Sequence, residues 1–285
     1  MSEPSGIYWL ASYPKSGNTW FRLIVTQLLM GPDSPVDLNT IQSGMIASSR
    51  EWMDVSLGFE SALLTHDEID CLRPEAYRWL HRQLKRVDYH KIHDAYTYLP
   101  NGDPLIPPDG CLGALYLVRN PLDVAISFAN HQGCSIDNAI EMMNNPEMAF
   151  CKRTNTQYPQ VRQKLLSWSD HVKSWRQAPN IPVQFIRYED MLSDSLATFS
   201  KAMQFLKIET PPEAIKKAID ATHISKLQTL ESETGFNEKP PKLERFFRKG
   251  ISGDWKTTLT PQQIQRIIND HGEVMQTLGY LDSRG

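Results

Sequence analysis

Cysteine is scarce in this chain, and the few cysteines present follow no recognisable pattern. There are four in 285 residues, with no C-x-x-C pair and no histidines at the spacing of a structural zinc site. This usage argues against such a site and fits a reducing compartment. We therefore predict that the protein requires no metal.

Long apolar runs are lacking too. The most apolar stretch, WFRLIVTQLLM (20–30), is too short to span a bilayer and contains Arg22. The first ten residues, MSEPSGIYWL, lack the basic segment followed by an apolar one that marks a signal peptide. We expect a soluble, cytoplasmic protein with no membrane partner.

The chain also lacks an excess of positive charge, since its formal net charge is −3. A nucleic-acid binder with a broad basic face is therefore not expected, and any anionic ligand must be held by local clusters. The content of 40% hydrophobic and 22% charged residues is ordinary for a globular protein. Without repeats or low-complexity tracts, residues 1–285 are predicted to form a single domain.

Apolar runs of strand length alternate with helical segments along the chain. Strands are expected over 7–12, 89–95, 112–118 and 181–189, and helices over 19–30, near 74–85, from 120, from 190 to about 206, and over 260–279. This alternation predicts an α/β fold with a central, mainly parallel sheet flanked by helices. The polar stretch 230–245, with its Gly and Pro, is expected to be a surface loop.

The first strand ends in a polar turn, ASYPKSGNTW (11–20), that leads into an apolar helix. Ligands of parallel α/β sheets bind at such turns, because the unpaired N–H groups and the dipole of the helix N-terminus attract anions. Gly17 permits close backbone approach and Lys15 adds a charge, beside three potential donors: Ser16, Asn18 and Thr19. The turn favours a phosphate-like ligand, although a well-capped helix with a solvated lysine would read the same way.

A nucleotide hydrolase or kinase is disfavoured. Its P-loop requires G-x-x-x-x-G-K-[ST], whereas this turn has one glycine and places the lysine before it. No apolar strand ends in an obvious aspartate for Mg²⁺ either.

Two further segments carry cations beside glycines or helix starts. In LYLVRNPLDVAISF (115–128), Arg119 follows a strand and Ser127 lies two helical turns past the Asn120 cap. In FFRKGISGDWK (246–256), Arg248 and Lys249 precede Gly250. Each signal is weak alone, since a lone arginine commonly pairs with a surface carboxylate. Together with Lys15 they predict a ligand with several separated negative charges.

These three segments resemble the cytosolic-type sulfotransferases that use 3′-phosphoadenosine 5′-phosphosulfate (PAPS). YPKSGNTW is similar to their 5′-phosphosulfate loop Y-P-K-S-G-T-T-W, with one Asn for Thr. LYLVRNPLDVAISF resembles their 3′-phosphate segment, and RKGISGDWK their R-K-G-x-x-G-D-W-K signature. The resemblance, which spans residues 7–260, implies a soluble, bacterial-type small-molecule sulfotransferase with a P-loop-like nucleotide-binding architecture.

By position, the resemblance implies three sets of cofactor-binding residues. The 5′-phosphosulfate would be held by Lys15, Ser16, Gly17, Asn18 and Thr19. The 3′-phosphate would be bound by Arg119, Ser127, Arg248, Lys249 and Gly250. The adenine would contact Trp20, Tyr188 and Thr222. Where the family usually continues with Ser and Phe, this chain has His223 and Ile224, so one stacking contact is weaker or supplied elsewhere.

The resemblance also implies the catalytic residues. His93 in HKIH matches the family's general base, Lys91 fits a lysine that stabilises the transferring sulfuryl group, and Lys15 would neutralise the leaving group. Without the resemblance His93 is not distinguished, because most histidines are surface or core residues.

The predicted function is transfer of a sulfuryl group from PAPS to a hydroxyl or amine of a small-molecule acceptor, leaving adenosine 3′,5′-bisphosphate (PAP). The alternatives are a carbohydrate sulfotransferase and a non-catalytic nucleotide-binding protein. Possible acceptor-pocket walls, which are equally core material, are Trp52, Phe59, Tyr96, Tyr98, Phe150 and Tyr158. The family's dimer segment K-x-x-x-T-V-x-x-x-E is not intact, with Pro261 and Gln265 at its valine and glutamate, so the oligomeric state stays open.

Overall fold

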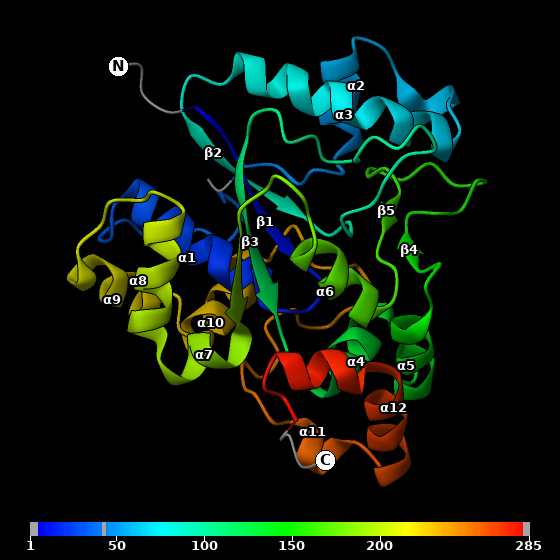
Figure 1. Cartoon of the computed structure of the whole chain (residues 1–285). Coiled ribbons are helices and arrows are strands. Elements are labelled where there is room, and N and C mark those ends of the chain that lie inside the picture. The colour runs from blue at the N-terminus through cyan, green and yellow to red at the C-terminus, as the bar shows by residue number, and fades with distance from the viewer. Residues whose placement is uncertain (1–4, 42–43, 282–285) are drawn as a thin grey trace. The chain divides into compact units, whose positions relative to one another are not determined.

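The computed structural model describes residues 5–41 and 44–281, which divide into two compact units. Unit 1 comprises 5–13, 44–116 and 143–184, and unit 2 comprises 14–41, 117–142 and 185–281. The chain passes from unit 1 to unit 2 three times: between residues 13 and 14, within β3 (Cys111–Val118), which Figure 1 labels, and within β6 (Val183–Arg187).

Unit 1 contains the strands that begin the fold and the helices that follow them. Its elements are β1 (Gly6–Ser12), α2 (Arg50–Leu57), the 3-10 helix η1 (Ser61–Leu63), α3 (His66–Gln83), β2 (Val87–Ile92), most of β3 (Cys111–Val118), β4 (Ala149–Phe150), β5 (Gln163–Lys164) and α6 (Trp168–Arg176). Unit 2 is largely helical, and its elements are α1 (Asn18–Met30), α4 (Pro121–Gln132), most of α5 (Ile136–Asn144), most of β6 (Val183–Arg187), α7 (Tyr188–Ser193), α8 (Ser195–Phe205), α9 (Pro212–Ala221), α10 (Ile224–Thr234), α11 (Trp255–Thr258) and α12 (Pro261–Thr277).

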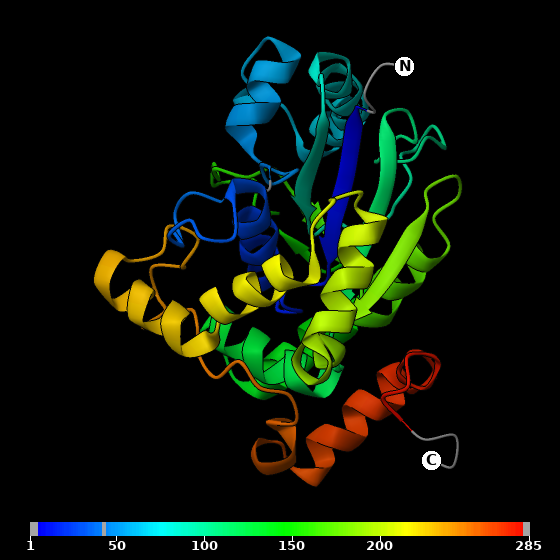
Figure 2. The same ribbon diagram turned by 90° about the vertical axis from the view of Figure 1, so that its left-hand side faces the viewer.

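The described strands form a sheet in the order β2-β1-β3-β6 and a separate antiparallel pair, β4 and β5. β1 and β2 are parallel, with Gly6 opposite Val87 and Ala11 opposite Ile92, and they lie side by side in Figure 2. Every residue of β1 is buried, which explains its uninterrupted apolar sequence. The predicted α/β fold with a central parallel sheet is confirmed.

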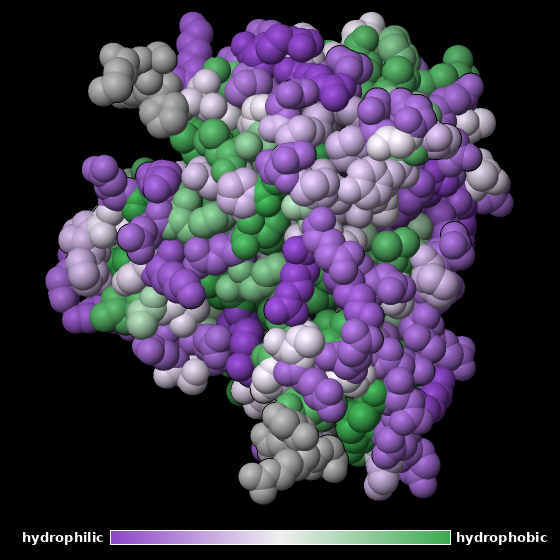
Figure 3. All heavy atoms as spheres, in the orientation of Figure 1, coloured by the Kyte–Doolittle hydropathy of each residue, from purple (hydrophilic) through white to green (hydrophobic). Residues whose placement is uncertain are grey.

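The helix starts follow the capping residues in the sequence. Thr65 and Glu68 form a reciprocal capping box at α3, and Thr260 and Gln263 form another at α12. At α4, the Asn120 side chain accepts a hydrogen bond from the Leu122 N–H at 3.0 Å, and Pro121 occupies the first helical position. The outward surface over α3 is mostly hydrophilic in Figure 3, as its exposed acidic and basic residues require.

The apolar core of unit 2 includes residues from a stretch expected to be exposed. Leu23, Leu38, Leu227, Phe236 and Phe247 form one buried cluster. The prediction of a surface loop over 230–245 is therefore partly wrong, because residues 230–234 complete α10 and the ring of Phe236 is buried. Because the neighbours of Phe236 in the chain are mostly polar, local composition does not indicate that its ring is buried.

Candidate nucleotide-binding site and catalytic residues

The polar turn between β1 and α1 has a backbone that only certain residues tolerate. Gly17 caps α1 with φ +94°, and a Cβ added there would lie 2.6 Å from Cδ2 of Tyr188. Lys15 also has a positive φ, of 71°. The first N–H groups of α1 have no partner inside the helix, so the turn presents several donors together.

Several buried polar atoms in unit 2 have no hydrogen-bond partner among the described residues. They include two donors of the motif segments: Oγ of Ser16, whose residue is fully buried, and Nε of Arg119. Leaving a buried donor unpaired is costly, so such atoms mark places where a ligand or water completes the structure. Both lie in segments predicted to contact phosphate groups, and both fit a ligand rich in oxygen atoms.

Arg119 connects the three motif segments. Its guanidinium donates to the Lys15 carbonyl at 3.4 Å and to the Ile251 carbonyl at 2.9 Å. It also lies over the Tyr188 ring, 4.4 Å from the ring centre. The polar turn, the strand-to-helix segment and the RKGISGDWK segment therefore meet in unit 2. Burial raises the pKa of Tyr188, although the positive charge of Arg119 opposes that shift.

The two cations of the RKGISGDWK segment share one carboxylate. Arg248 Nη2 lies 3.0 Å from Asp254 Oδ2, and Lys249 Nζ lies 2.6 Å from Asp254 Oδ1. Burial alone would raise the pKa of Asp254, but the hydrogen bonds from the two cations outweigh burial and lower it. Gly250, with φ +64°, has no room for a side chain because a Cβ would lie 2.7 Å from Ile224.

The residues predicted to contact the adenine also lie together. Trp20 Nε1 donates to Thr222 Oγ1 at 3.3 Å, and the Trp20 ring meets Tyr188 edge-on at 6.2 Å between centres. Asn18 is buried at the start of α1, while Thr19 and Ser127 are half-buried. All the predicted cofactor-binding residues lie in unit 2.

Four polar residues that position the cofactor segments were not found from the sequence. Asp123 accepts hydrogen bonds from the N–H groups of Gly253 at 2.7 Å and Trp255 at 3.0 Å. The others are Glu189, which accepts from the Asn120 N–H, Glu231, which accepts from the Phe246 and Phe247 N–H groups, and Gln228, which donates to the Phe247 and Arg248 carbonyls. The one sequence signal for such a role is an acidic residue in the first turn of a helix, as Asp123 is in α4.

His93 lies in unit 1, directly after β2 and one residue beyond Ile92. Its Nδ1 lies 2.8 Å from the Ser12 carbonyl oxygen and 3.2 Å from Ser12 Oγ. Because a carbonyl can only accept, Nδ1 carries the proton and the lone pair of the neutral ring lies on Nε2. Ser12 is three residues before Lys15 in the chain.

Lys91 is held by backbone pairing on both sides of β2. It pairs with Leu10 of β1, and on its other side its N–H donates to the Met45 carbonyl at 3.2 Å and its carbonyl accepts from the Ala47 N–H at 2.8 Å. Its side chain is half-buried. Its backbone position is thus fixed.

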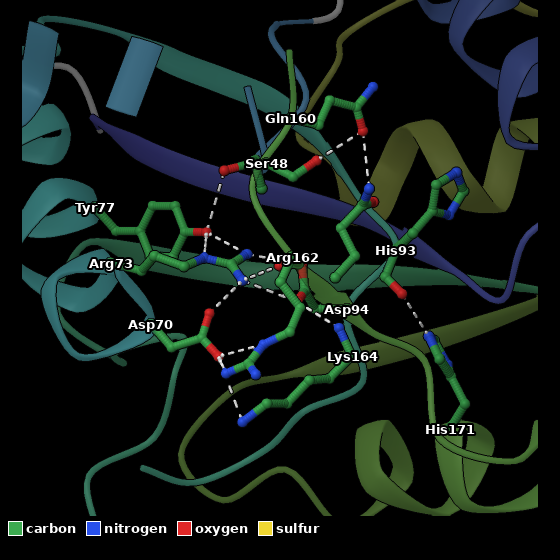
Figure 4. A network of polar contacts seen from close by, with 12 residues as sticks. Ser48, Asp70, Arg73, Tyr77, His93, Asp94, Gln160, Arg162, Lys164 and His171 are labelled. Atoms are coloured by element: carbon green, nitrogen blue, oxygen red, sulfur yellow. Dashed lines mark hydrogen bonds and ion pairs between the residues drawn. The ribbon is translucent and has the colours of Figure 1, made fainter. Parts of the chain in front are cut away.

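A second histidine lies behind His93 in unit 1 (Figure 4). His171 Nε2 donates to the His93 carbonyl at 3.0 Å, and the Tyr116 hydroxyl donates to His171 Nδ1 at 2.7 Å. Burial lowers the pKa of His171 to about 4. His171 is therefore neutral near pH 7.

The possible acceptor-pocket walls separate into different environments. Trp52 is buried and stacks on the ring of Tyr77. Tyr96 is also buried, and its ring meets that of Trp175 edge-on. Tyr158 lines an open hollow of about 570 Å³ in unit 1, with Ile46, Ser49, Arg50, Glu51, Asp54, Gln157, Pro159 and Gln160. The lining of this hollow is mostly polar.

Within residues 5–41 and 44–281, no cluster of three or more His, Cys, Asp or Glu side chains could hold a metal ion. No helix of that part of the chain is long and apolar enough to cross a membrane.

The profile of the sulfotransferase domain family matches residues 7–279. Mouse sulfotransferase 1E1 is 26% identical over 273 residues, covering 92% of this chain and 80% of that protein. Cytosolic sulfotransferase 17 of Arabidopsis thaliana is 22% identical over 290 residues, covering 97% and 76%.

Two solved structures share the fold. Mouse sulfotransferase SULT7A1, complexed with PAP, matches with a TM-score of 0.58 at 21% identity, covering 96% of this chain and 86% of that one. Retinol dehydratase, in a complex with retinol and PAP, gives 0.58 at 19%, covering 94% and 81%. The chain belongs to the sulfotransferase family, and the relatives it matches include proteins named as cytosolic sulfotransferases. The resemblance inferred from the three motifs is confirmed.

Proposed function

We propose that this protein transfers the sulfuryl group of PAPS to a hydroxyl or amine of a small molecule, and that residues 1–285 act as one domain. The observation that carries the proposal is the junction at Arg119, which joins the three motif segments around two unpaired buried donors, Ser16 Oγ and Arg119 Nε. PAPS carries anionic oxygens at two separate places, its 5′-phosphosulfate and its 3′-phosphate, and we assign the motif segments to these two groups.

Three groups of residues in unit 2 would each bind a different part of the cofactor. The turn of Lys15 to Thr19 would bind the 5′-phosphosulfate, with Ser16 Oγ and the first N–H groups of α1 as donors. Arg119, Ser127, Arg248, Lys249 and Gly250 would bind the 3′-phosphate. Trp20, Tyr188 and Thr222 would enclose the adenine. When Arg248 and Lys249 bind a phosphate, they exchange part of their pairing with Asp254 for it.

The transfer needs an acceptor that loses a proton and a leaving group that gains charge. PAPS supplies the activated sulfuryl group. His93, with its lone pair on Nε2, would take the proton of the acceptor hydroxyl or amine. The Lys15 ammonium would neutralise the charge on the departing phosphate oxygen, and Lys91 would stabilise the sulfuryl oxygens. No metal is assigned a role.

For the acceptor, the cellular location and the partners, we propose only the general class. Retinol dehydratase, which shares the fold, is in a complex with the small molecule retinol, and we assign a small-molecule acceptor here, with the hollow beside Tyr158 as its candidate site. Relatives named as cytosolic support a cytoplasmic location. We expect no nucleic-acid partner. Pro261 is the first residue of α12 and the family's dimer segment is altered, so no dimer is proposed from it.

The test compares thermal unfolding with PAP, ADP and AMP at equal concentrations. A ligand that binds only the folded protein at 100 times its dissociation constant adds about 2.7 kcal/mol of stability. Selective stabilisation by PAP is expected. Equal stabilisation by ADP, or no stabilisation by any of the three nucleotides, would show that the two-phosphate site is absent and would contradict the proposal.

A further inference from the structure

The residue that follows His93 carries a carboxylate in a fully buried ion pair (Figure 4). Asp94 Oδ1 lies 2.9 Å from Arg73 Nη1 and Asp94 Oδ2 lies 2.7 Å from Arg73 Nη2, which is a two-pronged contact. Both side chains are 0% exposed. Burial alone would lower the pKa of Arg73, but the Asp94 carboxylate outweighs it and raises that pKa.

The arginine is completely satisfied where it lies. Its remaining N–H groups donate to the Tyr77 hydroxyl at 3.1 and 2.9 Å and to the Arg162 carbonyl at 3.0 Å. A guanidinium has five N–H donors, and each has a partner here. The orientation of Arg73, and through it that of Asp94, is therefore tightly determined.

The backbone around His93 is held at three further points. The Lys164 N–H donates to Asp94 Oδ1 at 3.1 Å, and Trp175 Nε1 donates to the Asp94 carbonyl at 3.0 Å. His171 donates to the His93 carbonyl at 3.0 Å. The carbonyls of two consecutive residues and the carboxylate of the second are thus all fixed by side chains or backbone of unit 1.

A buried ion pair is a poor means of stabilising a protein. Removing two charges from water is costly, and apolar residues of similar volume commonly give equal or greater stability. What the charged pair supplies is a defined geometry, because both oxygens of Asp94 must face both Nη atoms of Arg73. The residue beside the pair is His93, whose ring orientation determines which nitrogen carries the lone pair.

We propose that Asp94, held by Arg73, is a positioning residue for His93. It fixes the backbone at residue 93 so that Nδ1–H of the imidazole donates to the Ser12 carbonyl and the lone pair stays on Nε2. Its relevance to catalysis rests on the proposed role of His93 as general base. Nothing in the motif resemblance assigns a role to Arg73 or Asp94.

The experiment uses two variants and one control in the full chain. Asp94→Asn keeps the shape but removes the charge, and it can fold poorly because it leaves Arg73 unpaired. The double variant Arg73→Met, Asp94→Leu replaces the whole pair with apolar groups and is expected to fold. Met53→Ala, in α2, removes a fully buried side chain that is not part of the ion pair and controls for general loss of stability.

Two readouts separate positioning from stability. The ¹⁵N chemical shifts of the His93 ring, assigned with a His93→Gln variant, report its tautomer at mildly alkaline pH. Turnover with PAPS, expressed per folded protein, gives kcat and KM. We expect a single tautomer in the wild type and in Met53→Ala, and a mixture of both tautomers in the Asp94 variants. We also expect kcat of those variants to fall roughly 10- to 100-fold, while KM for PAPS stays within about twofold.

A folded double variant with the wild-type tautomer, or with wild-type kcat, would overturn the proposal, and so would an equal fall of kcat in Met53→Ala. Failure of the proposed function is visible separately. If no acceptor supports turnover in the wild type, the tautomer measurement still decides whether Asp94 orients the ring.

Discussion

The ring of Tyr188 occupies the space that a side chain at residue 17 would need. A Cβ on Gly17 would lie 2.6 Å from the Tyr188 ring, and the φ of Gly17, +94°, is one that other residues rarely adopt. The turn proposed to hold the phosphosulfate and the aromatic ring proposed to contact the adenine are therefore fitted to each other.

Replacing Gly17 with alanine is expected to weaken PAP binding at least roughly tenfold, because the turn must shift to relieve about 1–3 kcal/mol of strain. Isothermal titration calorimetry with PAP measures this. The matched control is Gly235→Ala, since Gly235 also has a positive φ (+71°) but no atom lies within 4 Å of an added Cβ. Equal affinity of the Gly17→Ala variant and the wild type would contradict the account.

Replacing Arg119 with lysine keeps the charge but loses the planar donor set that reaches two carbonyls and the Tyr188 ring. We expect affinity for PAP to fall by about 1.5–3 kcal/mol, as for loss of a charged hydrogen bond. The selectivity for PAP over ADP should fall with it. Arg266→Lys, at a half-exposed surface pair with Asp137, is the control and should change neither quantity. Retained selectivity in Arg119→Lys would place the 3′-phosphate elsewhere.

Asp123 is expected to matter for both stability and binding. Its carboxylate accepts the N–H groups of Gly253 and Trp255, and an asparagine can accept only with its single amide oxygen. Asp123→Asn should lower the free energy of unfolding in urea by about 1–3 kcal/mol and weaken PAP binding. Asp137→Asn, which alters an exposed ion pair, should change stability by less than about 1 kcal/mol. Comparable losses in the two variants would argue against a special role for Asp123.

His171 gives the folded protein a defined dependence on pH. Burial holds its pKa at about 4, whereas in the unfolded chain it titrates near its ordinary value of about 6.5. The stability that neutral His171 contributes is therefore complete above about pH 6.5 and is lost as pH falls toward 4. The loss is about 1.4 kcal/mol per pH unit, or about 2 kcal/mol by pH 5.

Urea unfolding at about pH 7 and pH 5 measures that loss. The variant His171→Gln lacks the titrating ring, so its stability should fall by about 2 kcal/mol less than that of the wild type over this interval. An identical fall in both proteins would show that His171 is not the group responsible.

The fold and the three motif segments of the family could be recognised from the sequence because their signals are local. Each strand of the main sheet contains a short apolar run, several helix starts carry a cap such as Asn120, and Gly17 marks a turn that has no room for a side chain. That the first two motifs lie close together also follows from their positions after β1 and β3. The RKGISGDWK segment follows α10 and no strand, so its place beside Arg119 carries no such signal.

The supporting polar residues could not be predicted, since their partners are far away in the chain. Asp123 and Gly253 are 130 residues apart, and Glu231 holds the N–H groups of Phe246 and Phe247 from a stretch that reads as a polar loop. Arg73 lies just before the helix expected near 74–85, yet it is inside α3 and fully buried. Periodicity and composition carry no information about such pairings.

The most direct test of the central claim is an assay with ³⁵S-labelled PAPS and a panel of phenols, alcohols and amines. The account predicts PAP release that depends on an acceptor, with the label in the product. It further predicts that turnover is lost in His93→Ala while PAP still binds, and is lost in Lys15→Ala. Tight PAP binding without transfer to any acceptor, or wild-type turnover in His93→Ala, would contradict it. The first result would indicate a non-catalytic nucleotide-binding protein, and the second a different base.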